Sequence, residues 1–135
     1  MREAGLIGLW GAQAQNFLFW FVAVTSIVFV APLTLAPMTW ARVFQWRLPE
    51  DPDLAFYFGR CLGALAVAVE FLLWRGAHDL AIAPTAIIAI GVFCAIMVVV
   101  HFHGAIRRIQ PWTETLEIPL WAAAAVGCLL FYPAA

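Results

Sequence analysis

Residues 80–102 read LAIAPTAIIAIGVFCAIMVVVHF, and no Asp, Glu, Lys or Arg occurs among them. A helix needs about 20 apolar residues to cross the hydrocarbon core of a membrane. This segment has that length, so it predicts a membrane-spanning helix.

Three other apolar segments meet or approach the same length. The whole chain is 65% hydrophobic and only 11% charged, whereas about a quarter of the residues in an ordinary soluble domain are charged. A chain of 135 residues cannot hide that much apolar surface inside itself. We therefore predict an all-α integral membrane four-helix bundle, a single domain 1–135 with spans at about 17–37, 54–74, 80–102 and 116–132.

The segment 38–53 between the first two spans is predicted to be an interfacial loop or short helix. Trp40, Phe44 and Leu48 follow one another at steps of four, while Arg42 and Arg47 lie elsewhere on the helical wheel. Such a segment can lie along the membrane surface with its apolar side down.

The orientation follows from the arginines, because basic residues are retained on the cytoplasmic side of a membrane. Loops 38–53 and 103–115 hold Arg42, Arg47, Arg107 and Arg108. The opposite side has only Arg2 and Arg75. We predict an inner or plasma membrane protein with both of these loops in the cytoplasm and both termini outside.

Several function classes are excluded by the composition. The seven basic residues are all arginines and are scattered, so the clustered basic face of a nucleic-acid binding protein is missing. Cys61, Cys94 and Cys128 lie in apolar stretches and are predicted to pack as small core residues. Ser26, the only serine, has no histidine near it in the sequence. An enzyme is therefore the less favoured reading.

Glu70 lies within the second span, and an ionisable side chain there is costly and usually functional. It shares a helix face with Gly59, Gly63 and Ala66, which are small enough to allow close helix packing. Glu70 is thus expected to face the bundle. Two interpretations stay open: a proton or cation carrier, or a carboxyl near the end of the span that is neutralised or paired with Arg75.

The stretch HFHGAIRR at 101–108 follows the third span directly. His101 and His103 are about 200° apart on a helix, so they cannot chelate one metal together. We predict no metal site; the alternative is a copper site of Cys94, Met97 and His101, which share one helix face. His78 lies at the opposite membrane face, which argues against haem bound between two histidines of one chain.

A cluster of polar side chains, here called the cytoplasmic pole, is predicted at the cytoplasmic ends of the spans. Its members are Arg42, Arg47, Arg60, His101, His103, Arg107, Arg108, Glu114 and Glu117. Such a pole can hold an anionic lipid headgroup or a quinone head between helices. It can equally be ordinary cytoplasmic charge, with Arg60 extended to the headgroups and with Glu114 and Glu117 at the N-terminal end of the last helix.

The stretch FGRCLGALAVAVEFLL at 58–73 resembles the DoxX-like families of small bacterial membrane proteins, as does the four-span plan. Members often begin a span with an arginine followed closely by a leucine-glycine step, here Arg60, Leu62 and Gly63. The resemblance implies a four-helix inner-membrane protein and assigns no reaction.

We predict a non-catalytic subunit or accessory protein of a membrane assembly, because the short loops leave no room for a soluble catalytic domain. Its partners would be lipids, further copies of the chain or other membrane subunits, and no cofactor is predicted. One alternative is a small membrane enzyme or a binder of a lipid or quinone at the cytoplasmic pole. A second is a proton-coupled transporter that uses Glu70.

Overall fold

The computed structural model describes residues 6–133, and all regular elements of that part are helical. Four helical stretches are long and apolar enough to cross a membrane: Gly11–Leu35, Asp53–His78, Ala83–Arg107 and Trp112–Leu130. The predicted all-α fold with four spans is confirmed. Arg2, which entered the prediction of orientation, lies outside the described residues.

The spans and the connection between the first two are built from several shorter elements. The first span contains η1 (Gly11–Gln13), α1 (Ala14–Thr25), the π-helix η2 (Ser26–Val30) and α2 (Ala31–Leu35). The remaining elements are α3 (Pro37–Val43), α4 (Asp53–His78), α5 (Ala83–Arg107), α6 (Trp112–Thr115) and α7 (Glu117–Leu130). The predicted interfacial segment 38–53 thus contains one short helix, α3, followed by a loop.

The second and third spans continue beyond their predicted ends. α4 runs through Trp74 and Gly76 to His78. The connection to α5 is therefore shorter than the predicted turn at 75–79, and Pro84 stands in the first turn of α5, where a proline is tolerated. A Cβ atom at Gly76 would lie 2.7 Å from Ala86 Cβ, so this glycine lies where α4 packs closely on α5. α5 ends where Arg108 adopts a left-handed conformation, with φ of 55°.

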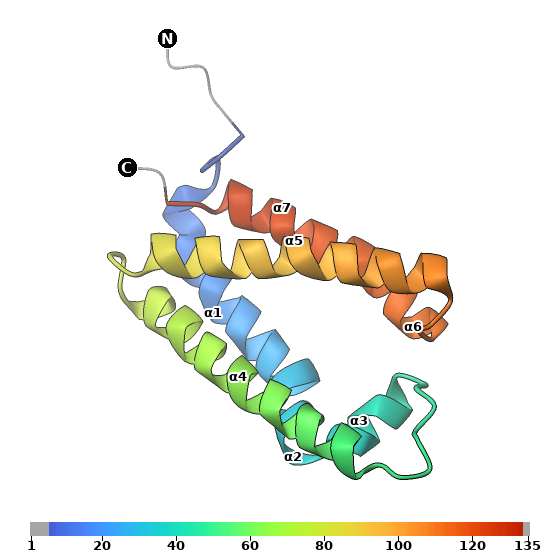
Figure 1. The fold of residues 1–135 in the computed structure, drawn as a ribbon. Helices are drawn as coiled ribbons and strands as arrows, with labels where there is room; N and C mark the ends of the chain where they lie inside the picture. The colour runs from blue at the N-terminus through green and yellow to red at the C-terminus, as the bar shows by residue number, and fades with distance from the viewer. Residues whose placement is uncertain (1–5, 134–135) are drawn as a thin grey trace.

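The helices are arranged as two pairs (Figure 1). α1 packs along α4, and α5 packs along α7. The pairs meet where α4 turns into α5, and their axes diverge toward the other end, where α2, α3 and α6 lie. The buried core, which includes Leu18, Leu73, Ile87 and Cys94, occupies the region where the pairs meet.

The small-residue face of α4 packs against the first span and α3. A Cβ atom at Gly63 would lie 2.7 Å from Thr34 Cα, and one at Gly59 would lie 2.6 Å from Pro37 Cβ. Only glycine allows so close an approach between the backbones. Gly59 and Gly63 thus lie where α4 meets other helices of the same chain.

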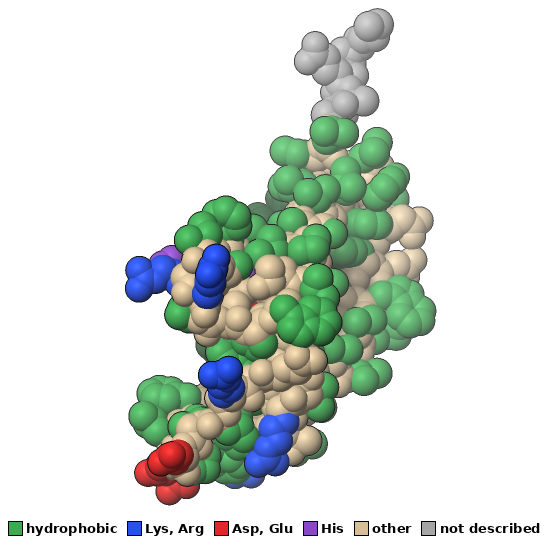
Figure 2. Space-filling view, turned by 90° about the vertical axis from the view of Figure 1, so that its right-hand side faces the viewer, with side chains coloured by type: hydrophobic (Ala, Val, Ile, Leu, Met, Phe, Trp, Pro, Cys, Tyr) green, Lys and Arg blue, Asp and Glu red, His purple; other side chains and the backbone are tan. Residues whose placement is uncertain are grey.

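The end of the molecule that carries α6 and the α3–α4 loop is the polar end (Figure 2). Arginine side chains are spread over this face, with acidic side chains at its lower edge. The antiparallel helices bring to it the exposed residues Arg42, Arg47, Arg60, His103, Arg107 and Arg108. Many large apolar side chains elsewhere are exposed, as expected of a surface that contacts lipid.

Candidate metal centre

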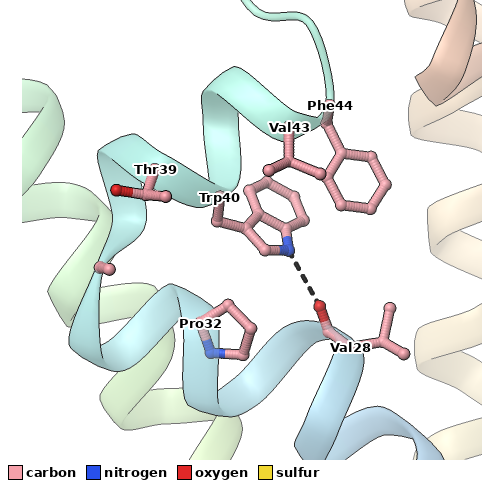
Figure 3. A pocket seen from close by; sticks show the side chains of 7 residues that line it. Val28, Pro32, Thr39, Trp40, Val43 and Phe44 are labelled. Atoms are coloured by element: carbon pink, nitrogen blue, oxygen red, sulfur yellow. Dashed lines mark hydrogen bonds between the residues drawn. The ribbon is translucent and has the colours of Figure 1, made fainter.

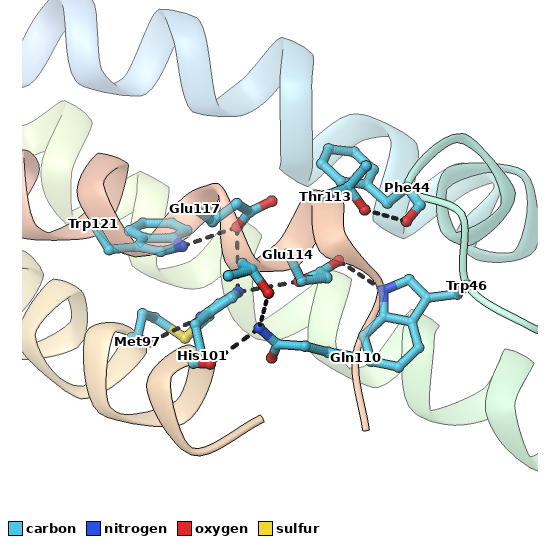
Figure 4. Close-up of polar contacts among 10 residues, drawn as sticks. Phe44, Trp46, Met97, His101, Gln110, Thr113, Glu114, Glu117 and Trp121 are labelled. Atoms are coloured by element: carbon cyan, nitrogen blue, oxygen red, sulfur yellow. Dashed lines mark hydrogen bonds and ion pairs between the residues drawn. The ribbon is translucent and has the colours of Figure 1, made fainter. Parts of the chain in front are cut away.

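Three ionisable side chains meet inside the polar end (Figure 4). His101 Nε2 lies 3.1 Å from Glu114 Oε2 and 3.4 Å from Glu117 Oε2. All three residues are buried, with 4%, 7% and 7% of their surfaces exposed. Within residues 6–133 this is the one group of three or more His, Cys, Asp or Glu side chains whose ligand atoms lie within 4.8 Å of one another.

A local break in the fourth span presents both carboxylates to His101. Glu114 belongs to α6 and Glu117 to α7, and the two helices are separated only at Leu116. Pro119 explains the break, because it cannot donate a hydrogen bond to the carbonyl four residues earlier, at Thr115. Residues three apart still share a helix face, so both side chains turn toward α5.

The tautomer of His101 is set by its own helix. His101 Nδ1 lies 2.8 Å from the carbonyl oxygen of Met97, one turn earlier in α5. A carbonyl only accepts, so Nδ1 carries a proton and donates it. In a neutral imidazole the lone pair is then on Nε2, the atom that faces the two carboxylates. A proton or a metal cation must lie between Nε2 and these oxygens, because otherwise lone pairs would face one another.

Each carboxylate is held by a tryptophan. Trp46 Nε1 donates to Glu114 Oε1 at 2.6 Å, and Trp121 Nε1 donates to Glu117 Oε2 at 2.9 Å. Together with the hydrogen bond from His101 to the Met97 carbonyl, these contacts hold the side chains of His101, Glu114 and Glu117 in position. Ligands of protein-bound metals are usually oriented by such outer hydrogen bonds.

One oxygen of the centre has no partner. Glu117 Oε1 is buried and makes no hydrogen bond, although the Glu117 side chain is only 9% exposed. A buried oxygen without a partner costs free energy. A cation bound by both oxygens of Glu117, or a water molecule on that cation, would satisfy it.

The geometry and the charge both suit a divalent first-row metal ion. Ligand atoms about 2.0–2.2 Å from zinc lie about 3.4 Å apart in a tetrahedral site, and the observed separations are 3.1 and 3.4 Å. Two ionised carboxylates and a neutral imidazole carry two negative charges, which a divalent cation balances. One nitrogen and two oxygen ligands suit zinc, manganese or iron better than the soft copper(I) ion.

The centre is covered by two neighbouring segments. Gln110 Nε2 donates to the carbonyl oxygen of His101 at 3.0 Å and to Thr115 Oγ1 at 3.2 Å. Gly104 makes room for this, because a Cβ atom there would collide with the Gln110 side chain. On the other side Trp46 lies against Glu114, as Figure 4 shows.

The structure separates the other members of the cytoplasmic pole from this centre. His103 is exposed, because α5 continues through it and turns it away from His101, as the helix geometry predicts. Arg60 lies over the Phe56 ring at 4.5 Å, and Arg107 and Arg108 are exposed. Within the described chain, no arginine forms an ion pair with Glu114 or Glu117.

A copper site of Cys94, Met97 and His101 would need a free ring nitrogen on His101. Both ring nitrogens of His101 are engaged, by the Met97 carbonyl and by the carboxylates. Neither is left for the sulfur atoms of Cys94 and Met97. Cys94 and Cys128 belong to the buried core, as predicted for small core residues, whereas the same prediction is wrong for Cys61, which is exposed.

Glu70 forms a second, separate polar contact. Its carboxylate accepts hydrogen bonds from Thr25 and Ser26 across the α1–α4 interface, at 2.7 and 2.6 Å. Within residues 6–133 it forms no ion pair with Arg75. Glu70 therefore faces the bundle, as expected, but its partners are hydroxyl groups.

Several residues of these sites were not foreseen. Trp121 follows Glu117 by four residues, and Met97 precedes His101 by four. Both contacts could therefore have been predicted from the spacing of residues on a helix. Trp46 lies 68 residues from Glu114 in sequence. No local pattern in the sequence indicates that contact or those of Thr25 and Ser26.

Comparison of the chain with protein-family models, with curated proteins and with solved structures finds no match.

Proposed function

We propose that the chain is a small integral membrane protein whose function depends on one divalent metal ion held by His101, Glu114 and Glu117. The observation that carries this proposal is that His101 Nε2 is directed at two buried carboxylates, each held by an indole. Three protein ligands leave a coordination position for water or a substrate. The ion would act there as a Lewis acid, or be taken up and passed on.

The test is direct metal analysis of the purified protein in detergent. After loading with Zn²⁺ and dialysis, we expect about one zinc per chain by mass spectrometry of the elements, in keeping with a single three-ligand site. His101→Ala and Glu117→Gln should weaken zinc binding by roughly tenfold or more. Glu117→Gln keeps the volume of the side chain, and circular dichroism checks that the helices are intact.

His103→Ala is the matched control, because His103 lies on the same helix and is exposed. It should bind zinc as the unchanged protein does. The proposal fails if the unchanged protein retains no more zinc than His101→Ala, since the three residues would then form only a hydrogen-bonded cluster. It also fails if His103→Ala loses as much zinc as His101→Ala.

A second candidate function is the binding of a lipid or quinone, and a groove between α1 and α7 favours it. The groove has a volume of about 620 Å³ and a mostly apolar lining that includes Phe17, Trp20, Phe29, Trp121 and Ala124. Its aromatic and small side chains fit an acyl or isoprenoid chain. Trp121 also donates to Glu117, so a ligand in the groove would lie next to the metal centre. Mass spectrometry of the protein with co-purified lipids tests this.

We also propose that the chain is a non-catalytic subunit, that it is related to the DoxX-like group, and that it has the predicted orientation in the membrane. A cysteine placed at exposed His103 should react with a membrane-impermeant maleimide only after the membrane is opened, and one at exposed Gln13 should react in intact cells. The reverse pattern would contradict the orientation. Native mass spectrometry would detect partner chains or further copies.

A further inference from the structure

Glu70 lies deep in its helix. α4 ends at His78, eight residues later, which corresponds to about 12 Å at 1.5 Å per residue. The sequence alone places the end of this span near Trp74, one turn away from Glu70. The longer helix makes Glu70 a carboxyl of the membrane span rather than of its end.

Two hydroxyl groups meet the two oxygens of this carboxyl. Thr25 Oγ1 lies 2.7 Å from Glu70 Oε1, and Ser26 Oγ lies 2.6 Å from Glu70 Oε2. Ser26 begins the π-helix η2. Such local widening of an α-helix occurs frequently at functional sites.

The hydrogen bonds around Glu70 can form with the carboxyl either ionised or protonated. Thr25 Oγ1 also lies 2.8 Å from the carbonyl oxygen of Phe21, and a hydroxyl has a single proton to donate. If Thr25 donates to Phe21, the short contact with Glu70 Oε1 needs a proton on the carboxyl. Glu70 then donates to Thr25, Thr25 donates to Phe21 and Ser26 donates to Glu70.

Within residues 6–133, no neighbouring cation offers an alternative way to neutralise Glu70. α1, η2 and α2, which pack on α4, contain no charged residue. On α3 and α4 the charged or titratable side chains are exposed: Arg42, Asp53, Tyr57, Arg60, Cys61, Arg75 and His78. On α5, His101 belongs to the metal centre, Cys94 lies in the core, and His103 and Arg107 are exposed.

The site also has a route to its surroundings. Thr25 lines the apolar groove between α1 and α7, so its hydroxyl connects Glu70 with that groove. The groove can bring a small apolar reagent from the membrane to Thr25, which contacts the carboxyl.

We propose that Glu70, Thr25 and Ser26 form a site that binds and releases one proton within the membrane span. The site is separate from the metal centre and does not depend on it. It gives this chain the carboxyl that a proton-exchanging membrane protein needs.

Dicyclohexylcarbodiimide tests this proposal, because this apolar reagent adds to protonated carboxyl groups within membranes. The whole protein is treated in detergent over a range of pH, and the labelled residue is identified by mass spectrometry of peptides. We expect labelling at Glu70 that decreases by roughly tenfold for each pH unit above its midpoint. Glu70→Gln should abolish it.

Thr25→Val removes the hydroxyl that contacts Glu70 Oε1 and should move the midpoint of labelling, whereas Thr85→Val, the same change at an exposed site of α5, should not. The proposal is overturned if Glu70 in the unchanged protein is not labelled at any pH or is labelled equally at every pH. Protection of Glu70 by sodium chloride but not by choline chloride at fixed pH would overturn it in favour of a sodium site. Loss of zinc binding would leave these outcomes unaffected.

Discussion

The chemistry of the metal centre depends on one hydrogen bond of one residue. Because Met97 accepts from His101 Nδ1, Nε2 is available for a cation. Glu114 and Glu117 complete a set of ligands that is buried and of opposite charge to that cation. The indoles of Trp46 and Trp121 then decide where the carboxylate oxygens lie.

Trp121→Phe should weaken zinc binding by about tenfold, which is the usual effect of removing an outer hydrogen bond from a metal ligand. The phenyl ring can still pack on Phe29 and Phe93, whose ring centres lie 5.7 and 5.6 Å from that of Trp121. The helices should therefore remain intact. Zinc titration measures the affinity, and the visible spectrum of the cobalt-substituted protein reports the altered position of the carboxylate.

Trp74→Phe is the control for this change, because Trp74 is exposed and lies against His78 at the far end of α4. Its zinc affinity and cobalt spectrum should equal those of the unchanged protein. If Trp121→Phe also leaves both unchanged, Trp121 does not position Glu117.

The sequence indicated which single residues are functional candidates better than it indicated what those residues contact. His101, Glu114, Glu117 and Glu70 are conspicuous because polar groups are costly near or within a membrane span. The sequence placed His101, Glu114 and Glu117 together in the cytoplasmic pole, but their direct contact was not predicted, because it depends on how far one helix is shifted along another. That shift brings His101 to both glutamates and leaves Arg60 apart from them.

At the scale of the elements, a proline explains the irregular path of the first span. Pro32 has no N–H group, so the carbonyl of Val28 lacks its partner four residues later. Trp40 Nε1, which folds back from α3, donates to this carbonyl at 3.0 Å (Figure 3). Trp40 was predicted to lie on the apolar side of an interfacial segment; in the structure it also completes the hydrogen bonding of the helix before it.

This compensation predicts a coupling between two substitutions. Trp40→Phe should lower the free energy of unfolding by about 1–2 kcal/mol, the cost of leaving a backbone carbonyl without a partner. In a Pro32→Ala background the cost should be smaller, because an alanine has a backbone N–H that can donate to the Val28 carbonyl. Unfolding in mixed micelles of the two single variants and the double variant measures the coupling. An equal loss in both backgrounds would show that the indole does not substitute for the missing N–H.

At the scale of the whole molecule, a strap joins the two helix pairs where they diverge. The strap consists of Phe44, Gln45 and Trp46, which follow α3. Its contacts with α6 are Thr113 Oγ1 to the Phe44 carbonyl at 2.5 Å, Trp112 Nε1 to Gln45 Oε1 at 2.8 Å, and Trp46 Nε1 to Glu114 Oε1 at 2.6 Å. The strap thus covers the metal centre and also holds the polar end together.

The number of spans and the polar end were predictable, because both depend on local composition. Apolar length predicts a span wherever it occurs, and arginines mark the ends of spans. The strap was not predictable, because its residues lie in a loop and their partners are 67 to 69 positions away. The left-handed conformation of Gln45, with φ of 63°, has no signal in the sequence either.

Weakening the strap should loosen both the polar end and the metal centre. In the triple variant Trp46→Phe, Trp112→Phe and Thr113→Val, the α1–α4 pair loses its hydrogen bonds to α6. Zinc should dissociate about tenfold faster, which corresponds to roughly 1.4 kcal/mol. Spin labels at Leu54→Cys and Ile106→Cys, both exposed positions at this end, should report a longer and broader distance in a Cys61→Ala background.

Trp20→Phe combined with Thr85→Val makes similar chemical changes at exposed positions and should alter neither the distance nor the rate. If the triple variant keeps the narrow distance but releases zinc faster, Trp46 acts on Glu114 alone and the strap does not hold the pairs together. If the distance increases while the zinc rate is unchanged, the strap joins the pairs without closing the centre. The strap has both roles only if the two measurements change together, because the same segment connects the pairs and holds Glu114 of the candidate metal centre.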